Sequence, residues 1–278
     1  MPPRDSDDRA WLSYDSVAET YERVAVPWFT PMARDLVAAA GMSAGMRVLD
    51  VGTGTGLTAG LAAERIGLTR PVVGVDPSLR MLGLARRRPG VTVVRAGVPG
   101  LPFSDATFDV ALANLVLSHF PDLDHGLADL RRVLRPGGRV GVTAWGPGVA
   151  DEDDDGTEAD QIVASVREQC GMSSNAPVAG APWEERLRSK AELRGALTAA
   201  GFDDVEARLS TYRTTFRVDD FLAGWGGLGR YLRWHAGLER WHDFSERAAT
   251  ALRARFGETV VVVKQLWVTT ATRPIVGE

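Results

Sequence analysis

Residues Val48–Gly56 read VLDVGTGTG, and this stretch decides the fold class. An apolar run typical of a buried strand leads into glycines at positions 52, 54 and 56, and a helical pattern follows from Leu57. Glycines at such a turn let the backbone bend tightly and let a ligand approach with no side chain in between. The alternative is a strand-to-helix turn in which the glycines serve packing alone.

An acidic residue at the end of the next strand supports the ligand interpretation. Asp76 lies twenty residues beyond Gly56, directly after the apolar run Val72–Val75. In doubly wound folds, a carboxylate at this place accepts hydrogen bonds from ribose hydroxyls. Asp76 could also cap the helix that Pro77 begins, and the two roles are compatible. The glycine loop and the acid together predict a nucleoside cofactor.

The spacing of the glycines separates two classes of cofactor. A dinucleotide loop has the pattern G-x-G-x-x-G, whereas here the third glycine comes one residue early. Asp50 lies at the start of the loop, where a negative charge would repel a pyrophosphate but suit a cationic cofactor. The pattern therefore opposes an NAD-dependent dehydrogenase, which stays the less favoured enzyme class.

Short valine-rich runs alternate with helical stretches outward from this loop, which predicts an α/β protein with a parallel sheet covered on both faces. At the N-terminal end, helical spacing predicts one helix that ends before Pro27 and a second that begins near Pro31. An acidic stretch, Asp151–Glu158, is expected to be an exposed loop. The expected strands are Arg47–Val51, Val72–Val75, Val91–Arg95, Phe108–Ala113, Arg139–Ala144, Val205–Phe216 and Thr259–Thr270, and the helices after the loop are Leu57–Ile66, Ser78–Arg87, Asp124–Leu134 and Ala191–Ala200.

Composition excludes several classes of protein. The chain has 278 residues, a formal net charge of −4 and one cysteine, so an internal disulfide, a four-thiolate zinc site and a cysteine-ligated cluster are excluded. No secretory signal and no long apolar stretch is present, which predicts a cytoplasmic protein without a membrane partner. The mild acidity predicts no nucleic-acid partner and a small-molecule substrate instead. A monomer and a homodimer are both compatible with the sequence.

The motifs resemble those of the class I S-adenosylmethionine-dependent methyltransferases, in particular the small-molecule enzymes of ubiquinone and menaquinone biosynthesis. The resemblance covers about residues 14–145 and includes motifs in the family's order. It implies a Rossmann-like, doubly wound, seven-stranded and mostly parallel sheet with a helical substrate cap. The motifs are YDSVAETYERV (Tyr14–Val24), VLDVGTGTG, VVGVDPS (Val72–Ser78), LPFSDATFDVALANLVLSHFPD (Leu101–Asp122) and LRRVLRPGGRV (Leu130–Val140).

The resemblance also implies which residues hold S-adenosylmethionine and its product S-adenosylhomocysteine. Asp76 and Pro77 would lie at the ribose and Met81 at the adenine, while Asn114 and Leu115 would lie beside the methionine tail. Asp50 and the backbone of Gly52, Gly54 and Gly56 would face the methionine part. The family usually carries an acid at position 97 that binds the adenine amino group, whereas this chain has Gly97. Adenine recognition would therefore fall to backbone groups of Gly97 and Val98.

His119 is the candidate general base, because it follows the fourth strand at a place where related enzymes carry a histidine near the methyl group. A histidine near its ordinary pKa can take a proton from a hydroxyl during methyl transfer. A structural histidine that binds a backbone carbonyl is the alternative. No grouping of acids and histidines predicts a metal site.

The substrate is expected to contact aromatic residues from two segments. One is the helical insertion 219–257, with Tyr231, Trp234, Leu238 and Trp241 at helical spacing and His235 as an alternative base. The other is the N-terminal helix, with Tyr14 near the cofactor and Tyr21 and Trp28 near the substrate. Ordinary packing against the core is the alternative for both segments. Arg233, Arg240 and Arg247 are either a solvated face or an anchor for an anionic substrate.

These patterns predict a methyltransferase acting on a hydroxyl of a secondary metabolite. The alternatives are a protein that keeps the fold without transferring a methyl group, such as a rearrangement catalyst or a binding protein, and an N- or C-methyltransferase. The expected parts are a lid helix (1–29), a cofactor-binding core (30–150), an acidic loop, helix and sixth strand (151–218), a cap (219–257), and a last strand with the tail (258–278).

Overall fold

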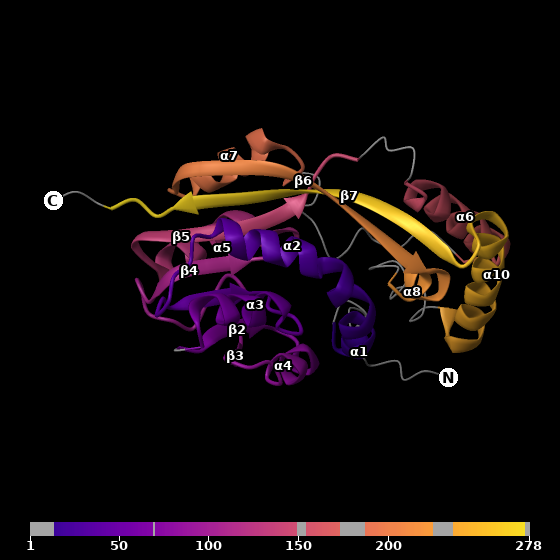
Figure 1. The fold of residues 1–278 in the computed structure, drawn as a ribbon, viewed down its shortest axis with the longest axis horizontal. Coiled ribbons are helices and arrows are strands. Elements are labelled where there is room, and N and C mark those ends of the chain that lie inside the picture. Colours follow the sequence, from indigo (N-terminus) through magenta and orange to yellow (C-terminus); the bar gives the residue numbers. More distant parts are fainter. Residues whose placement is uncertain (1–13, 69, 149–153, 173–186, 225–235, 276–278) are drawn as a thin grey trace. The chain divides into compact units, whose positions relative to one another are not determined.

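The computed structural model describes residues 14–68, 70–148, 154–172, 187–224 and 236–275. The chain divides into two compact units, whose elements can be followed in Figure 1. Unit 1 consists of Met1–Trp28, Val149–Gly180 and Arg213–Val263. Unit 2 consists of Phe29–Gly148, Ala181–Tyr212 and Lys264–Glu278.

A seven-stranded sheet has the order β3-β2-β1-β4-β5-β7-β6. The pairs β1–β2, β1–β4, β2–β3 and β4–β5 are parallel, and β7 pairs with β5 in the antiparallel direction. The predicted fold class, a doubly wound and mostly parallel sheet, is therefore confirmed. The strands are β1 (Val48–Val51), β2 (Val72–Asp76), β3 (Val91–Arg95), β4 (Phe108–Ala113), β5 (Leu134–Trp145), β6 (Asp203–Arg217) and β7 (Thr259–Thr272).

Helices cover both faces of the sheet in unit 2. Buried residues of α5 and α7 pack with strand residues in one apolar cluster, while α2 and α3 contribute to a second cluster. Since β1 is buried along its whole length, its apolar run is explained by helices on both sides. These helices are α2 (Val26–Ala39), α3 (Leu57–Ile66), α4 (Leu79–Ala85), α5 (Leu123–Val133) and α7 (Lys190–Ala199).

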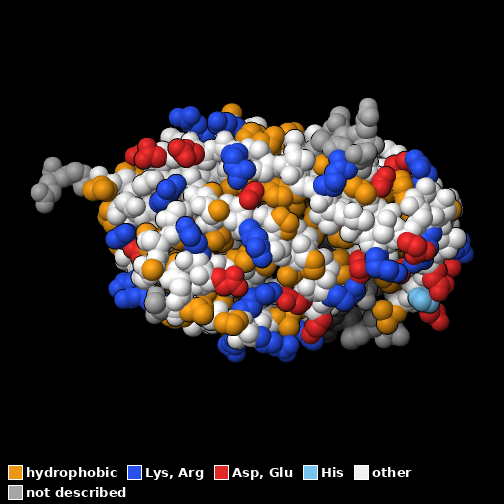
Figure 2. Space-filling view, viewed as in Figure 1, with side chains coloured by type: hydrophobic (Ala, Val, Ile, Leu, Met, Phe, Trp, Pro, Cys, Tyr) orange, Lys and Arg blue, Asp and Glu red, His pale blue; other side chains and the backbone are white. Residues whose placement is uncertain are grey.

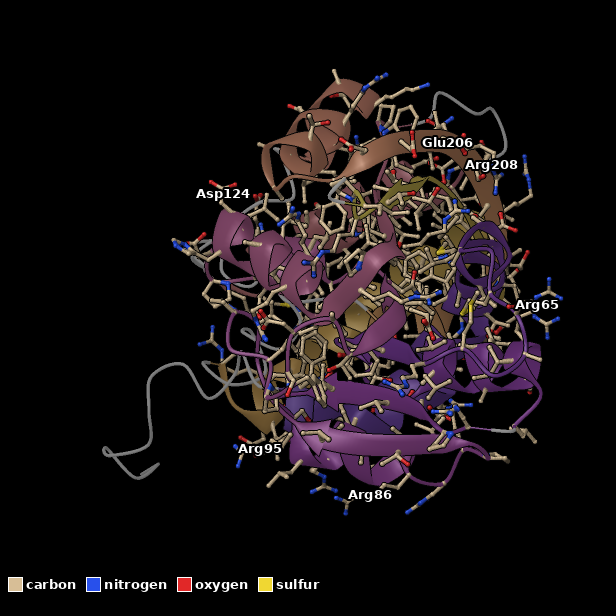
Figure 3. All side chains as sticks on the ribbon, turned by 90° about the vertical axis from the view of Figure 1, so that its left-hand side faces the viewer. Arg65, Arg86, Arg95, Asp124, Glu206 and Arg208 are labelled. Carbon is tan, nitrogen blue, oxygen red and sulfur yellow. The ribbon has the colours of Figure 1, made fainter. Side chains whose placement is uncertain are left out.

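Strand β3 forms one edge of the sheet. Its exposed positions include Arg95, and Arg86 follows the neighbouring helix α4. Both arginines point away from the ribbon in Figure 3. Charged side chains on an edge strand hinder pairing with a second chain, which is sufficient reason for this basic edge.

The N-terminal helical region differs from the prediction of two helices separated near Pro27. It is one unbroken run of η2 (Tyr14–Val17), α1 (Ala18–Thr20), the π-helical turn η3 (Tyr21–Ala25) and α2. Proline lacks an N–H and crowds the preceding turn, and a π-turn is the kind of irregularity that accommodates such a residue. The prediction of a break at Pro27 is therefore wrong.

Unit 1 has its own apolar core, built from α6 (Gly156–Gln169), α8 (Val218–Ala223), α10 (Leu238–Phe256) and the start of β7. Phe244, Ala248 and Leu252 of α10 are buried in it at helical spacing. Leu238 is 74% exposed, so the predicted stripe does not include it. Arg240 donates to the carbonyl oxygens of Cys170 and Gly171 just after α6, where a cation suits the helix dipole.

The acidic stretch is only partly a solvated loop. Asp154 accepts hydrogen bonds from the backbone N–H groups of Gly156 and Val263, and Asp155 accepts one from Val261. Both side chains are half-buried, so the prediction of exposure is wrong for these two residues. Their carboxylates satisfy backbone donors at the start of β7, a role that charge repulsion along the sequence does not indicate.

The surface carries charges of both signs. Basic and acidic side chains are intermixed on the face shown in Figure 2. Among the described residues, no helix combines the length and the apolar character needed to cross a membrane.

Candidate functional site

The glycine loop of unit 2 connects β1 to α3 and is held in place by backbone bonds. Thr53 donates its N–H to the carbonyl of Val75 at 2.9 Å, and Gly56 donates to the carbonyl of Thr53 at 2.8 Å. Arg88, beyond α4, donates from Nε to the carbonyl of Thr55 at 2.7 Å. The loop is therefore fixed to strand β2 and to the turn after α4.

The three glycines serve different purposes. All three have positive φ angles, of 64° at Gly52, 53° at Gly54 and 81° at Gly56. A Cβ at Gly52 would overlap Val116, and a Cβ at Gly56 would lie 2.9 Å from Ala85. A Cβ at Gly54 would meet no atom within 4 Å. Packing alone thus explains Gly52 and Gly56, whereas Gly54 borders open space that a ligand can occupy.

Asp50 is a buried carboxyl group at the end of β1, with 1% of its surface exposed. Its Oδ2 accepts a hydrogen bond from the Thr53 hydroxyl at 2.6 Å, while Oδ1 is buried without a hydrogen-bond partner among the described residues. Burial raises the pKa of Asp50 to about 7, and the nearby charge of Asp76 adds to the rise. A cation in the space above the loop would stabilise the ionised form.

Asp76 ends β2 and is tied to the glycine loop. Its Oδ2 accepts from the N–H of Gly54 at 3.0 Å, and its Oδ1 accepts from the N–H of Ser78 at 2.9 Å. Ser78, rather than Asp76, is the N-cap of α4, since its hydroxyl accepts from the N–H of Met81 at 3.1 Å. The two amide bonds fix the plane of the Asp76 carboxylate next to Gly54, in an orientation that could receive ribose hydroxyls.

Asn114 and Leu115 follow β4, which lies beside β1 in the sheet. The hydroxyl of Thr143 on β5 donates to Asn114 Oδ1 at 2.7 Å and accepts from the N–H of Leu115 at 2.8 Å. Leu115 has a φ of 54°, a conformation that costs free energy for a residue with a side chain. The structure thus places Asn114 at the carboxyl ends of the parallel strands, where Asp50 and Asp76 also lie.

The segment after β3 contains two of the positions expected at the adenine, Gly97 and Val98. Gly97 has no atom within 4 Å of the place of a Cβ, and Val98 is 8% exposed. The loop that follows is anchored by Asp129, whose Oδ2 accepts from the N–H groups of Gly100 and Leu101, both at 2.7 Å. The space next to Gly97 is therefore open while its neighbours are held firmly.

Arg132 completes this anchor. It pairs with Asp129 at 2.7 Å and donates to the carbonyl oxygens of Leu101 and Phe103.

Met81, the other residue expected at the adenine, is 2% exposed and packed inside unit 2.

His119 lies at the end of the short 3-10 helix η4 (Leu117–His119) and is exposed. Its N–H donates to the carbonyl of Val116 at 2.9 Å. The adjacent Ser118 lines a small cavity of about 10 Å³ in unit 2, together with Leu115, Thr143, Ala144, Trp145 and Leu187. A cavity of this size has room for about one water molecule. His125 is also exposed and bound to Asp122 at 2.7 Å, a contact that raises its pKa.

The aromatic candidates of unit 1 contact other aromatic residues of the same unit. Tyr14 and Tyr21 stack edge to face with ring centres 6.1 Å apart, and Trp28 meets Phe216 in the same way at 5.4 Å. Trp241 packs on the buried Phe244 and so contributes to the core of unit 1. Three further candidates lie outside the described residues, namely Tyr231, Trp234 and His235.

The sequence patterns did not indicate the residues that hold the loops of the site in place. Thr53, Arg88, Asp129, Arg132 and Thr143 bind the loops that carry the predicted residues. The one local signal was Thr143, a polar residue inside the apolar run Val140–Trp145. The others could be found only through contacts between distant segments.

Known proteins with similar sequences indicate the class of this protein. Residues 48–138 match the family of methyltransferase domains. The chain is 29% identical over 258 residues to nocamycin O-methyltransferase from Saccharothrix syringae, covering 86% of this chain and 87% of that protein. It is 34% identical over 140 residues to aklanonic acid methyltransferase DauC from Streptomyces sp. strain C5, covering 48% and 63%.

A solved structure shows the same fold. Phosphoethanolamine N-methyltransferase 2 from Haemonchus contortus, in complex with S-adenosyl-L-methionine, matches with a TM-score of 0.57 and 21% identity, over 99% of this chain and 61% of that one. The chain carries a methyltransferase domain and has the fold of the class I S-adenosylmethionine-dependent methyltransferases. Its cofactor is S-adenosylmethionine.

Proposed function

We propose that the protein transfers the methyl group of S-adenosylmethionine to a hydroxyl oxygen of a small secondary metabolite. The observation that carries this proposal is the match to nocamycin O-methyltransferase over 258 residues. That match extends well beyond residues 48–138, the part assigned to the methyltransferase domain, into the regions that differ most among enzymes of this fold. Aklanonic acid methyltransferase supports the same chemical context over a shorter stretch.

The residues of unit 2 fit the cofactor in this proposal. The fixed carboxylate of Asp76 would receive the ribose hydroxyls, and the open side of Gly54 would allow the backbone to approach the cofactor. Asp50, whose Oδ1 has no partner among the described residues, would balance positive charge. Met81, Gly97 and Val98 would border the adenine, with Pro77 next to the ribose.

The reaction is a single displacement in which the methyl carbon leaves sulfur and bonds to the acceptor oxygen. Alignment of oxygen, carbon and sulfur supplies much of the rate, up to roughly 7–11 kcal/mol for well-oriented groups. The hydroxyl proton goes to His119 in this proposal, because the residue is exposed at the end of η4, four residues beyond Leu115 in the chain.

The test is to incubate the protein with methyl-labelled S-adenosylmethionine and matched pairs of aromatic compounds, one with a free hydroxyl and one with that oxygen blocked. Label in the free compound alone, at a carbon with the chemical shift of an O-methyl group, is the expected result. Label on nitrogen or carbon would overturn the choice of oxygen. A protein that binds neither S-adenosylmethionine nor S-adenosylhomocysteine in calorimetry would overturn the whole proposal.

The role of His119 has its own test. Replacement His119→Ala should lower turnover by about 10²-fold with unchanged affinity for S-adenosylhomocysteine, as expected for loss of a general base. Replacement His125→Ala is the matched control, because His125 is a second exposed histidine in unit 2, bound to Asp122. A loss below tenfold at every pH would favour a mechanism based on positioning alone.

A further inference from the structure

Thr143 is a buried hydroxyl group in the middle of an otherwise apolar strand segment. It is 1% exposed and lies on β5 next to the carboxyl end of β4. A buried hydroxyl group must form hydrogen bonds inside the protein, because it has lost its bonds to water. Within the described residues, Thr143 has two partners, Asn114 and the backbone of Leu115.

The directions of these two bonds follow from chemistry. The backbone N–H of Leu115 can only donate, so it occupies an acceptor position on the Thr143 oxygen. The single hydroxyl hydrogen of Thr143 is then left for Asn114, and the atom that receives it must be the amide oxygen. Asn114 therefore turns its NH2 group away from Thr143, and no other hydrogen bond to its side chain is made within the described part of the chain.

Strand register places this amide beside the glycine loop. Asp50 pairs with Leu112 in the parallel pair of β1 and β4, so Asn114 follows the end of β4 next to the point where the glycine loop leaves β1. The close approach of Val116 to Gly52 shows that the two segments pack tightly at this point. Leu115, between them, keeps its positive φ of 54° with its N–H bound to Thr143. The hydroxyl thus fixes both the backbone and the side chain at this edge.

We propose that Thr143 is a positioning residue that makes Asn114 a hydrogen-bond donor to the carboxylate of the cofactor's amino-acid tail. The proposal rests on the proposed function of this site. An NH2 group suits a carboxylate because it offers two donors and no acceptor. Asp50, under the same loop, suits the cationic groups of the same tail, so the two side chains complement its groups of opposite charge.

Two ligands that differ in one group test this assignment. S-adenosylmethionine carries the carboxylate, and decarboxylated S-adenosylmethionine lacks it while keeping the ammonium and sulfonium charges. Calorimetry measures both with the wild type and with Thr143→Val, Thr143→Ser and Asn114→Asp. Thr269→Val is the matched control, because Thr269 is a fully buried threonine of the neighbouring strand β7 whose hydroxyl has no partner among the described residues.

The expected result is a loss that depends on the carboxylate. Thr143→Val should weaken S-adenosylmethionine about tenfold, and Asn114→Asp by at least as much, because it replaces the donor by an anion. Binding of the decarboxylated ligand should change less than about twofold, and Thr143→Ser should restore wild-type affinity.

Two results would overturn the proposal. One is an equal loss for both ligands in Thr143→Val, which would mean that Thr143 only supports the fold. The other is an unchanged affinity of Asn114→Asp for S-adenosylmethionine, which would place the carboxylate elsewhere. If the wild type binds neither ligand, the proposed function itself is refuted. This outcome is distinct from the other two, because in both of them the wild type binds S-adenosylmethionine.

Discussion

Affinity for S-adenosylmethionine should rise about tenfold between pH 6 and pH 8, because Asp50 must be ionised to receive the positive charge of the cofactor. Asp50 is 1% exposed, and burial raises its pKa from 3.8 to about 7. The hydroxyl of Thr53 opposes the rise, and the charge of Asp76 adds to it. Near neutral pH the carboxyl group is therefore about half protonated before the cofactor binds.

The size of the effect follows from the ionised fraction. If only the ionised form accepts the cation, the apparent dissociation constant is the intrinsic one divided by that fraction. For a pKa of about 7, the fraction is about a tenth at pH 6, about a half at pH 7 and about nine tenths at pH 8. Binding at pH 7 should then release about half a proton from the protein.

The assay is titration calorimetry at pH 6, 7 and 8 in two buffers that differ in heat of ionisation, which gives both the affinity and the number of protons released. Asp50→Asn is the matched variant, because it keeps the size of the side chain and removes its titration. Protonation of the ligand itself is common to both proteins, so their difference isolates Asp50. Equal pH dependence and equal proton release in the two proteins would refute the reasoning.

The same pKa shift affects stability without any ligand. The folded pKa lies above the unfolded value of 3.8, so between pH 4 and pH 7 the folded protein keeps a proton that the unfolded chain has lost. This stabilisation is complete below pH 4 and is lost as the pH rises through 7. The free energy of unfolding of the wild type should therefore fall, relative to Asp50→Asn, by up to about 4 kcal/mol between pH 4 and pH 8, as measured by urea unfolding.

Three further predictions concern the surroundings of the site. Gly97→Asp should tighten S-adenosylhomocysteine about tenfold in calorimetry, because its side chain enters open space and adds a charged acceptor at the adenine; unchanged affinity would place the adenine elsewhere. Arg132→Ala should lower the free energy of unfolding in urea by about 2–3 kcal/mol, since the buried carboxylate of Asp129 loses its ion-pair partner. Arg247→Ala, the control, removes an exposed ion pair and should lower it by less than about 0.5 kcal/mol, and equal losses would contradict the prediction. Gly52→Ala should destabilise the protein by about 1–3 kcal/mol more than Gly54→Ala, because only its methyl group overlaps a neighbour; a larger loss at Gly54 would disprove the assigned packing.

Several elements were predictable because their signals are local. The strands Val91–Arg95 and Phe108–Ala113 and the helix Leu57–Ile66 have the bounds that periodicity and flanking glycines predict. The class of cofactor also followed from local spacing, since the early third glycine and the acid at the end of the next strand lie within one strand–helix–strand unit.

Other features needed contacts between segments far apart in the sequence. The break expected at Pro27 is absent because a π-turn takes up the irregularity, and the acidic residues Asp154 and Asp155 are half-buried because they satisfy backbone donors of β7. No pattern in the residues around either site indicates the partner that decides its conformation.

The sequence by itself determined the fold class, the place of the glycine loop between a strand and a helix, and the place of Asp76 at the end of the next strand. Strand burial and a tight turn depend on residues that are neighbours in the chain. Only the tertiary structure decided which polar atoms are paired. It showed that Gly54, and not Gly52 or Gly56, borders open space, and that Thr143 sets the direction of the Asn114 amide. The physical reason is that a hydrogen bond is specified by the positions of both partners, and here those partners lie on different strands.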